Sequence, residues 1–219
     1  MEHFNRYVVF ILSVFFSISV FAKDITVINE VKNNDGSAWV IEVFGGGYNL
    51  KYTNSQGKMY SNSAIITSDI EVGNLFLDKV SDNSVSLLMS YPKDSYIFKF
   101  SSGPTPKLLS ACKKITLPSA DQQQAVTLLT LCSKDSVKEG MTLPNADAVN
   151  LLAPDNLMLA ENIKTLIGND KAFLYDSNKD PKRNNPYLIK GDVVEILEYR
   201  SSMLKVKYTS KSKTTIAWI

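Results

Sequence analysis

The sequence predicts a mainly β protein in three parts, and three observations lead to this fold class. Apolar residues alternate with polar ones from Lys23 to Lys107, which is the period of a half-buried strand. Prolines and helix-like spacing then mark a middle region, residues 108–168. The last part, residues 169–219, returns to short strands. We therefore expect an antiparallel β domain at 23–107, a short helical connector stapled by a disulfide at 108–168, and a small five-stranded barrel at 169–219.

The first 22 residues have the features of a secretory signal peptide. Arg6 precedes an uncharged run from Tyr7 to Ala22, and Val20 and Ala22 are the small residues that a signal peptidase needs. The run is shorter than the roughly 18–20 residues that span a bilayer, so cleavage is favoured over an uncleaved anchor. We expect a periplasmic or secreted protein with no stable membrane insertion after cleavage.

The two cysteines, Cys112 and Cys132, both follow the predicted signal. In an oxidising compartment such a pair is most simply a disulfide. A metal site or a nucleophilic thiol are the alternatives, and neither finds support, because the only histidine, His3, lies in the signal. We expect no cofactor and no bound metal.

The missing histidine also argues against an enzyme. Ser-His-Asp and Cys-His catalysis both need an imidazole to move the proton. The segments Ser55–Lys58, Ser81–Asn83 and Lys213–Thr215 imitate the order of motifs in penicillin-recognising enzymes. Ser55 lies in a turn rather than at the start of a helix, however, and the third segment lacks its glycine. A catalytic carboxylate pair, as in glycosidases, needs no fixed spacing and stays open.

The β domain at 23–107 is divided by turn sequences. Asn34–Gly36, Ser55–Gly57, Ser81–Ser84 and Tyr91–Asp94 each separate two apolar runs. These short connections favour an antiparallel meander. With a net charge of only +2 and mixed signs throughout, the chain lacks the concentrated basic face of a nucleic-acid-binding protein.

The middle region is expected to be helical. Ser119 and Gln122 have the spacing of a capping box, and four following residues repeat at i, i+3, i+4 and i+7: Ala125, Leu128, Leu129 and Cys132. A second helix is expected from Asp155 or Asn156 to Ile167, with Gly168 as its C-terminal stop.

The last part contains five short apolar runs, each expected to form a strand. They are Ala172–Tyr175, Tyr187–Ile189, Val193–Glu198, Leu204–Tyr208 and Thr215–Trp218.

This part resembles the bacterial SH3-like (Src-homology 3) domains of exported proteins. The resemblance covers about the last quarter of the chain and rests on five motifs: Ala172–Asp176 (AFLYD), Tyr187–Asp192 (YLIKGD), Val194–Glu198 (VEILE), Met203–Tyr208 (MLKVKY) and Ala217–Ile219 (AWI). Met203 replaces the usual aromatic residue and Ala217 the usual glycine. Some members of the family bind cell-wall peptides and others are structural modules.

The resemblance implies a binding function. The candidate ligand residues are the aromatic ones of the barrel, Tyr175, Tyr187, Tyr208 and Trp218, since aromatic side chains on a barrel face pack against extended peptides. A core role for Tyr187 and Trp218 is the alternative. We expect a non-catalytic protein of the cell envelope that contacts a cell-wall peptide or an envelope protein. The second hypothesis is an immunity or inhibitor protein that blocks a toxin or hydrolase.

Overall fold

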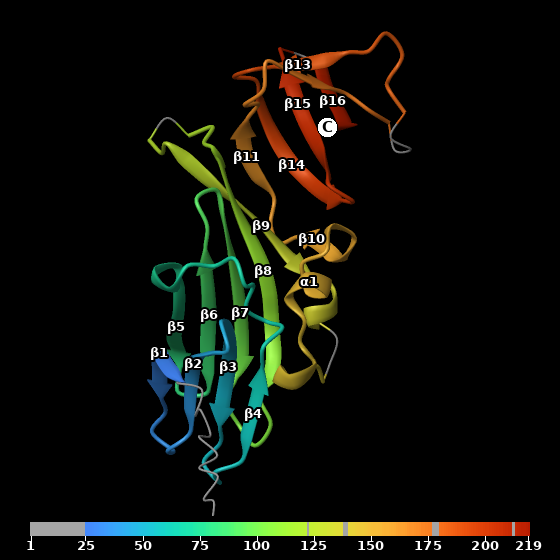
Figure 1. Ribbon diagram of the computed structural model, residues 1–219. Helices are drawn as coiled ribbons and strands as arrows, with labels where there is room; N and C mark the ends of the chain where they lie inside the picture. Colours follow the sequence, from blue (N-terminus) through green and yellow to red (C-terminus); the bar gives the residue numbers. More distant parts are fainter. Residues whose placement is uncertain (1–24, 122, 138–139, 177–179, 212) are drawn as a thin grey trace, which may run out of the picture.

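The computed structural model describes residues 25–121, 123–137, 140–176, 180–211 and 213–219, and most of them form antiparallel strands (Figure 1). The predicted signal peptide at 1–22 lies outside these residues. Within the described ranges, no helix has the length and apolar character needed to cross a membrane. The expected mainly β, antiparallel fold is confirmed.

The first sheet has four strands that pair in chain order, as a meander does. The turn between its first two strands contains Gly36 at φ +83°, and the turn between its last two contains Gly57 at φ +80°. Both φ values lie in the left-handed region that glycine adopts without steric cost. The strands are β1 (Thr26–Lys32), β2 (Ala38–Phe44), β3 (Gly47–Thr53) and β4 (Met59–Asn62).

The second sheet has six strands in the order β10-β9-β8-β7-β6-β5. They are β5 (Leu75–Ser81), β6 (Ser84–Ser90), β7 (Asp94–Ser101), β8 (Lys107–Pro118), β9 (Val126–Ser133) and β10 (Leu157–Leu159).

The two sheets enclose the first hydrophobic core. Trp39 and Tyr52 of the first sheet are fully buried, as are Phe98 and Phe100 of the second. The Trp39 ring centroid lies 4.5 Å from that of Tyr52 and 5.5 Å from that of Phe100. The indole nitrogen of Trp39 donates a hydrogen bond to Ser102 Oγ at 2.9 Å. The central aromatic residue thus fills the core without leaving its polar atom unpaired.

The expected helical connector is wrong, because strands and not helices are the main regular structure of the described part of this region. Most of the segment expected to form the first helix lies in β9, where Val126–Cys132 pairs with β8. Thr127 and Thr130 are β-branched, and Leu129 and Leu131 alternate with more exposed neighbours. This alternation has the period of a strand and includes every residue of β9, whereas only a few of its apolar residues have helical spacing. The expected second helix is also absent from the described structure, where Ile163–Leu166 forms β11.

Helical structure in the described residues is limited to single turns. They are η1 (Val72–Asn74), η2 (Asp135–Val137), η3 (Leu143–Asn145), α1 (Ala148–Leu151) and η4 (Pro154–Asn156).

Asn62 fixes the η3 turn to the edge of the first sheet. Its side-chain amide donates to Leu143 O at 2.5 Å and to Ala146 O at 2.6 Å. Its carbonyl oxygen accepts from the backbone N–H of Ala64 at 2.7 Å and of Ile65 at 3.0 Å. Because Asn62 is buried, these four bonds replace the water that its amide would otherwise bind.

The C-terminal part has strands at all five expected places, but they lie in two separate sheets rather than in one closed barrel. The larger sheet has the order β11-β14-β15-β16, and the smaller one pairs β12 with β13. The bounds are β11 (Ile163–Leu166), β12 (Lys171–Phe173), β13 (Tyr187–Ile189), β14 (Val193–Arg200), β15 (Met203–Ser210) and β16 (Lys213–Trp218).

A single long hairpin, β8–β9, belongs to both halves of the molecule (Figure 1). Leu108 and Ala111 at the start of β8 pack into the first core. Further along the hairpin, Leu117 of β8 and Leu129 and Leu131 of β9 pack into a second core, beneath the C-terminal sheet. The hairpin is therefore the structural element that joins the two cores.

The predicted disulfide between Cys112 and Cys132 is confirmed, and it crosses this hairpin. The two residues are directly paired across β8 and β9, one residue beyond Ala111 on β8. The bond thus covalently joins the two strands close to the point where β8 passes from one core to the other.

The disulfide lies in an apolar row on the outer face of the six-stranded sheet. The pairing register aligns one residue from each strand in this row, and Phe76 and Met158 at its ends are 40% and 43% exposed. The row consists of Phe76, Leu88, Ile97, Cys112, Cys132 and Met158. We call it the outer row.

We expect replacement of both cysteines by serine to lower the free energy of unfolding by about 3 kcal/mol, because the denatured chain regains the freedom of the closed loop. Urea denaturation measures this change. Wild-type protein unfolded under reducing conditions should match the variant. An unchanged midpoint, or free thiols in the denatured, unreduced protein, would contradict the role of the bond.

We also expect Asn62→Ala to lower the free energy of unfolding by about 3 kcal/mol, since it leaves buried backbone groups without partners. Asn83→Ala is the matched control. Asn83 lies in the exposed turn between β5 and β6, and its replacement should change the stability by less than about 0.5 kcal/mol. Equal losses in the two variants would refute the role of Asn62.

Candidate functional site

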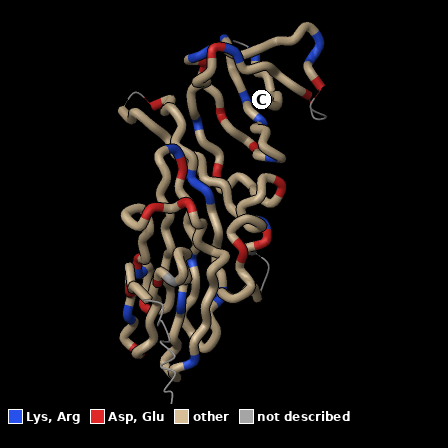
Figure 2. The backbone as a smooth tube through the Cα atoms, viewed as in Figure 1, with Lys and Arg blue, Asp and Glu red and all other residues tan. Residues whose placement is uncertain are grey.

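The larger C-terminal sheet has two chemically different faces. Val194, Ile196 and Val206 point inward and are almost fully buried in the second core. The outer face carries charged residues from neighbouring strands, and basic and acidic residues are interspersed over this part of the chain (Figure 2). The candidate site residues of the sequence analysis are distributed around this sheet.

The charged residues of the outer face form cross-strand ion pairs. Lys207 Nζ lies 3.2 Å from Glu195 Oε2, and Lys205 Nζ lies 3.4 Å from Glu198 Oε2. Arg200 also reaches Glu198, at 3.6 Å. Each pair is partly exposed, so its contribution to stability is small. Their main effect is to hold the long basic side chains in place over the sheet.

Tyr175 and Trp218 are brought together at the edge of this sheet. The Tyr175 N–H donates to Trp218 O at 2.9 Å, and the Trp218 N–H donates to Tyr175 O at 3.1 Å. Both residues line a shallow pocket of about 270 Å³ together with Lys182 and Lys205. We call it the Tyr175–Trp218 site.

The Trp218 ring is the buried floor of this site. Its exposed fraction is only 7%, which supports the core role that was weighed for this residue. Arg200 Cζ and Lys205 Nζ each lie 5.8 Å from the ring centroid, a cation–π distance. Tyr175 is half-buried, so its side chain is the accessible aromatic surface of the pair.

Tyr187 lies outside the Tyr175–Trp218 site. It lies on β13 and is 46% exposed. This exposure argues against a core role for Tyr187. Its ring centroid is 6.0 Å from that of Phe173 on the paired strand, and Lys171 Nζ lies 4.9 Å from its centroid. Tyr187 therefore belongs to a separate exposed patch on the small sheet.

Tyr208 is also separate. It is half-buried among the residues that pack on the second core, and its hydroxyl donates to Asp192 Oδ1 at 3.3 Å. Of the four aromatic candidates, the fold thus brings only Tyr175 and Trp218 together.

Sequence reasoning missed the basic members of the site. Lys205 is directly opposite Trp218 in the pairing of β15 with β16, and Arg200 approaches from the end of β14. The motif around Met203–Tyr208 contains Lys205, but only the strand register shows that it meets Trp218.

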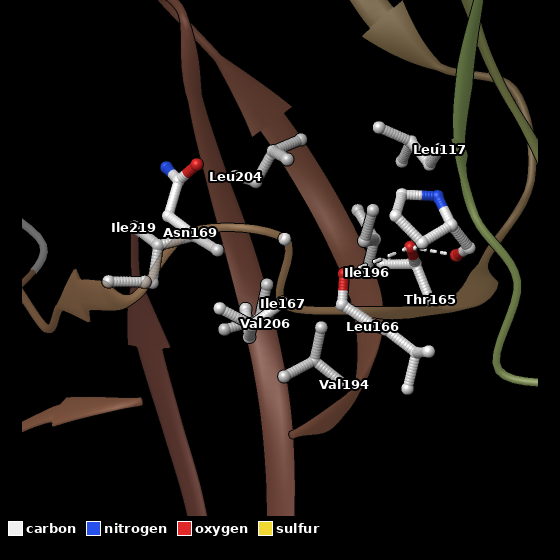
Figure 3. A pocket seen from close by; sticks show the side chains of 13 residues that line it. Leu117, Thr165, Leu166, Ile167, Asn169, Val194, Ile196, Leu204, Val206 and Ile219 are labelled. Carbon is white, nitrogen blue, oxygen red and sulfur yellow. Dashed lines mark hydrogen bonds between the residues drawn. The ribbon is translucent and has the colours of Figure 1, made fainter. Parts of the chain in front are cut away.

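An apolar cleft lies on the inner face of the same sheet (Figure 3). Its volume is about 270 Å³, and it separates Leu117 and Pro118 of β8 from Leu204 and Val206 of β15. Thr165 Oγ1 donates to Pro118 O at 2.7 Å across one end of the cleft. This bond connects β11 to the end of the long hairpin.

A polar pocket of about 210 Å³ lies at the end of the β sandwich and contains Asp69 and Tyr91. The Tyr91 hydroxyl contacts Thr67 Oγ1 and donates to Asp69 Oδ1 at 3.2 Å. Burial raises the pKa of Tyr91, and a hydrogen bond from Thr67 lowers the pKa of Asp69. At neutral pH the phenol therefore stays protonated and the carboxylate ionised, so the pair is poorly matched to proton transfer.

In the part of the chain that the structure describes, no three His, Cys, Asp or Glu side chains are grouped so as to hold a metal ion.

Comparison with protein-family models, with curated proteins and with solved structures finds no match to this chain.

Proposed function

We propose that this chain is an exported, non-catalytic binding protein of the cell envelope, and that its C-terminal strands form an SH3-like module that contacts a cell-wall peptide or a protein partner. The observation that carries the proposal is the Tyr175–Trp218 site. There, reciprocal backbone hydrogen bonds join Tyr175 to Trp218, and two basic side chains lie over the Trp218 ring.

The strand positions support the SH3-like part of the proposal. Each of the five motifs named in the sequence analysis contributes to a strand or to its end. The Tyr175 segment lies beside Trp218 at the end of β16. In a module of this kind, an aromatic surface at a sheet edge offers a contact face to an extended peptide.

The chemistry of the site favours an acidic, extended ligand. Arg200 and Lys205 are already oriented over the indole of Trp218, where both contact one carboxylate, Glu198. A carboxylate of the ligand would meet the same donors, and an apolar part of the ligand would pack on Tyr175. Cell-wall peptides and acidic protein segments both provide such groups.

Export is supported by the predicted signal and by the Cys112–Cys132 disulfide. A cross-strand disulfide persists in the periplasm or outside the cell and is rare in the cytosol.

The second candidate function, an immunity or inhibitor protein, is favoured by the outer row. A folded partner needs a broader surface than a peptide does, and the outer row extends across all six strands of its sheet. Phe76 and Met158 at its two ends are exposed apolar residues.

We expect Tyr175→Ala to weaken binding of the full mature chain to purified peptidoglycan about tenfold, because the change removes the accessible aromatic face. Its backbone bonds to Trp218 do not depend on the side chain, so the circular dichroism spectrum should not change. Tyr187→Ala is the matched control and should bind as the wild type does. Co-sedimentation over a range of protein concentrations measures both.

The same assay separates the two candidate functions. Ile97→Lys places a charge in the middle of the outer row and should not affect peptidoglycan binding. If wild-type protein does not sediment with peptidoglycan but captures one stoichiometric protein from an envelope extract, and Ile97→Lys abolishes this capture, the inhibitor hypothesis replaces the first. Steady hydrolysis of peptidoglycan by the purified chain would contradict both.

A further inference from the structure

The apolar cleft on the inner face of the C-terminal sheet is partly open to solvent. Its volume of about 270 Å³ lies between β8 and β15, with β11 at its lower end in Figure 3. The aliphatic side chains of this cleft are in contact with water where it is open. An apolar ligand in the cleft would remove that apolar surface from water, which is favourable.

The lining excludes charged ligand groups from the cleft. Thirteen of the described residues line it, and none of these is Lys, Arg, Asp or Glu. An ionised group inside would lose its hydration without gaining a partner of opposite charge. The lining also contains no Phe, Tyr or Trp, so it offers no ring on which a planar aromatic ligand would stack. The lining residues are mainly aliphatic, among them Val194, Ile196 and Val206.

The polar side chains of the lining are Thr165 and Asn169. The Thr165 hydroxyl donates to Pro118 O, and this bond occupies its proton. Asn169 is exposed, and Figure 3 shows its amide at the opposite end from Leu117. A ligand with one neutral polar end would place that end near Asn169 and its apolar part toward Leu117.

From these features we propose that the cleft binds one unbranched aliphatic chain of a soluble, single-chain amphiphile. The chain lies between Leu117 and Leu204, and its neutral polar end is at Asn169. This site is on the opposite face of the sheet from the Tyr175–Trp218 site and does not depend on the function proposed for that site.

A chain-length series tests the proposal on the full mature chain. Straight-chain primary alcohols from butanol to decanol are titrated, and the methyl NMR signals of Leu, Ile and Val are followed. Each added methylene should raise the affinity roughly fourfold until the cleft is full, after which the affinity should stop rising. The shifts should concentrate on Val194, Leu204 and Val206. No binding, or equal shifts at Leu50 and Leu87 in the first core, would overturn the proposal.

Gly168→Leu should block the cleft. Gly168 lines it, its φ is not in the left-handed region, and the nearest atom to an added Cβ is Pro118 Cγ at 3.9 Å. The variant should lose at least about tenfold in affinity for the longest alcohol that fits, since it displaces at least two methylenes. Gly73→Leu is the matched control. Its added Cβ meets nothing within 4 Å, and the affinity should not change.

Leu204→Ala should enlarge the cleft. The affinity should then continue to rise for alcohols longer than the longest one that fits the wild-type cleft. Tyr175→Ala should bind the alcohols as the wild type does, so that failure of this proposal is distinguishable from failure of the proposed function. Circular dichroism confirms that each variant is folded. Unchanged binding by folded Gly168→Leu would show that the alcohols bind elsewhere.

Discussion

The pairing of β8 with β9 is the interaction on which the rest of the structure depends. Ala111 on this hairpin is part of the first core, and Leu129 and Leu131 are part of the second. A rotation or slip of the hairpin would therefore disturb both cores at once. The Cys112–Cys132 bond prevents such a slip, because it joins two residues that are directly opposite in the register. The same constraint places Leu117 and Pro118 at the wall of the apolar cleft.

The sequence predicted the elements whose patterns are local. In the N-terminal meander, short turns and alternating apolar residues agree, so strands and connections both follow. The error at 119–132 has a specific cause. Leu128, Leu129 and Cys132 have helical spacing, whereas Leu129 and Leu131 have strand spacing, and the sequence alone does not rank the two. Pairing with β8 decides between them, since it includes Val126–Cys132 of β9 and brings Cys132 opposite Cys112.

The candidate site was only partly predictable for a related reason. Aromatic residues are visible in a motif, but their neighbours depend on strand register. Tyr187 and Tyr208 are aromatic residues of the same set of motifs, as Tyr175 is. In the fold, however, Tyr187 lies on the small sheet beside Phe173, and the Tyr208 hydroxyl bonds to Asp192. The cleft was not predictable at all. It arises where the end of the long hairpin meets the C-terminal sheet. The distance between these two elements depends on the tertiary fold, and no local sequence pattern predicts it.

The two faces of the C-terminal sheet suit different ligands. Successive side chains of a strand point to opposite faces, so charged residues gather on one face and aliphatic residues on the other. On β15, Lys205 and Lys207 face the ion pairs of the outer surface, whereas Val206 between them lines the cleft. On β16, Trp218 and Ala217 both line the Tyr175–Trp218 site, and Ala217 also packs in the second core. An acidic ligand is therefore excluded from the inner face by the cost of desolvation, and an aliphatic chain gains little on the charged outer face. Neighbouring residues of one strand thus line the two proposed sites, which lie on opposite faces of a single sheet.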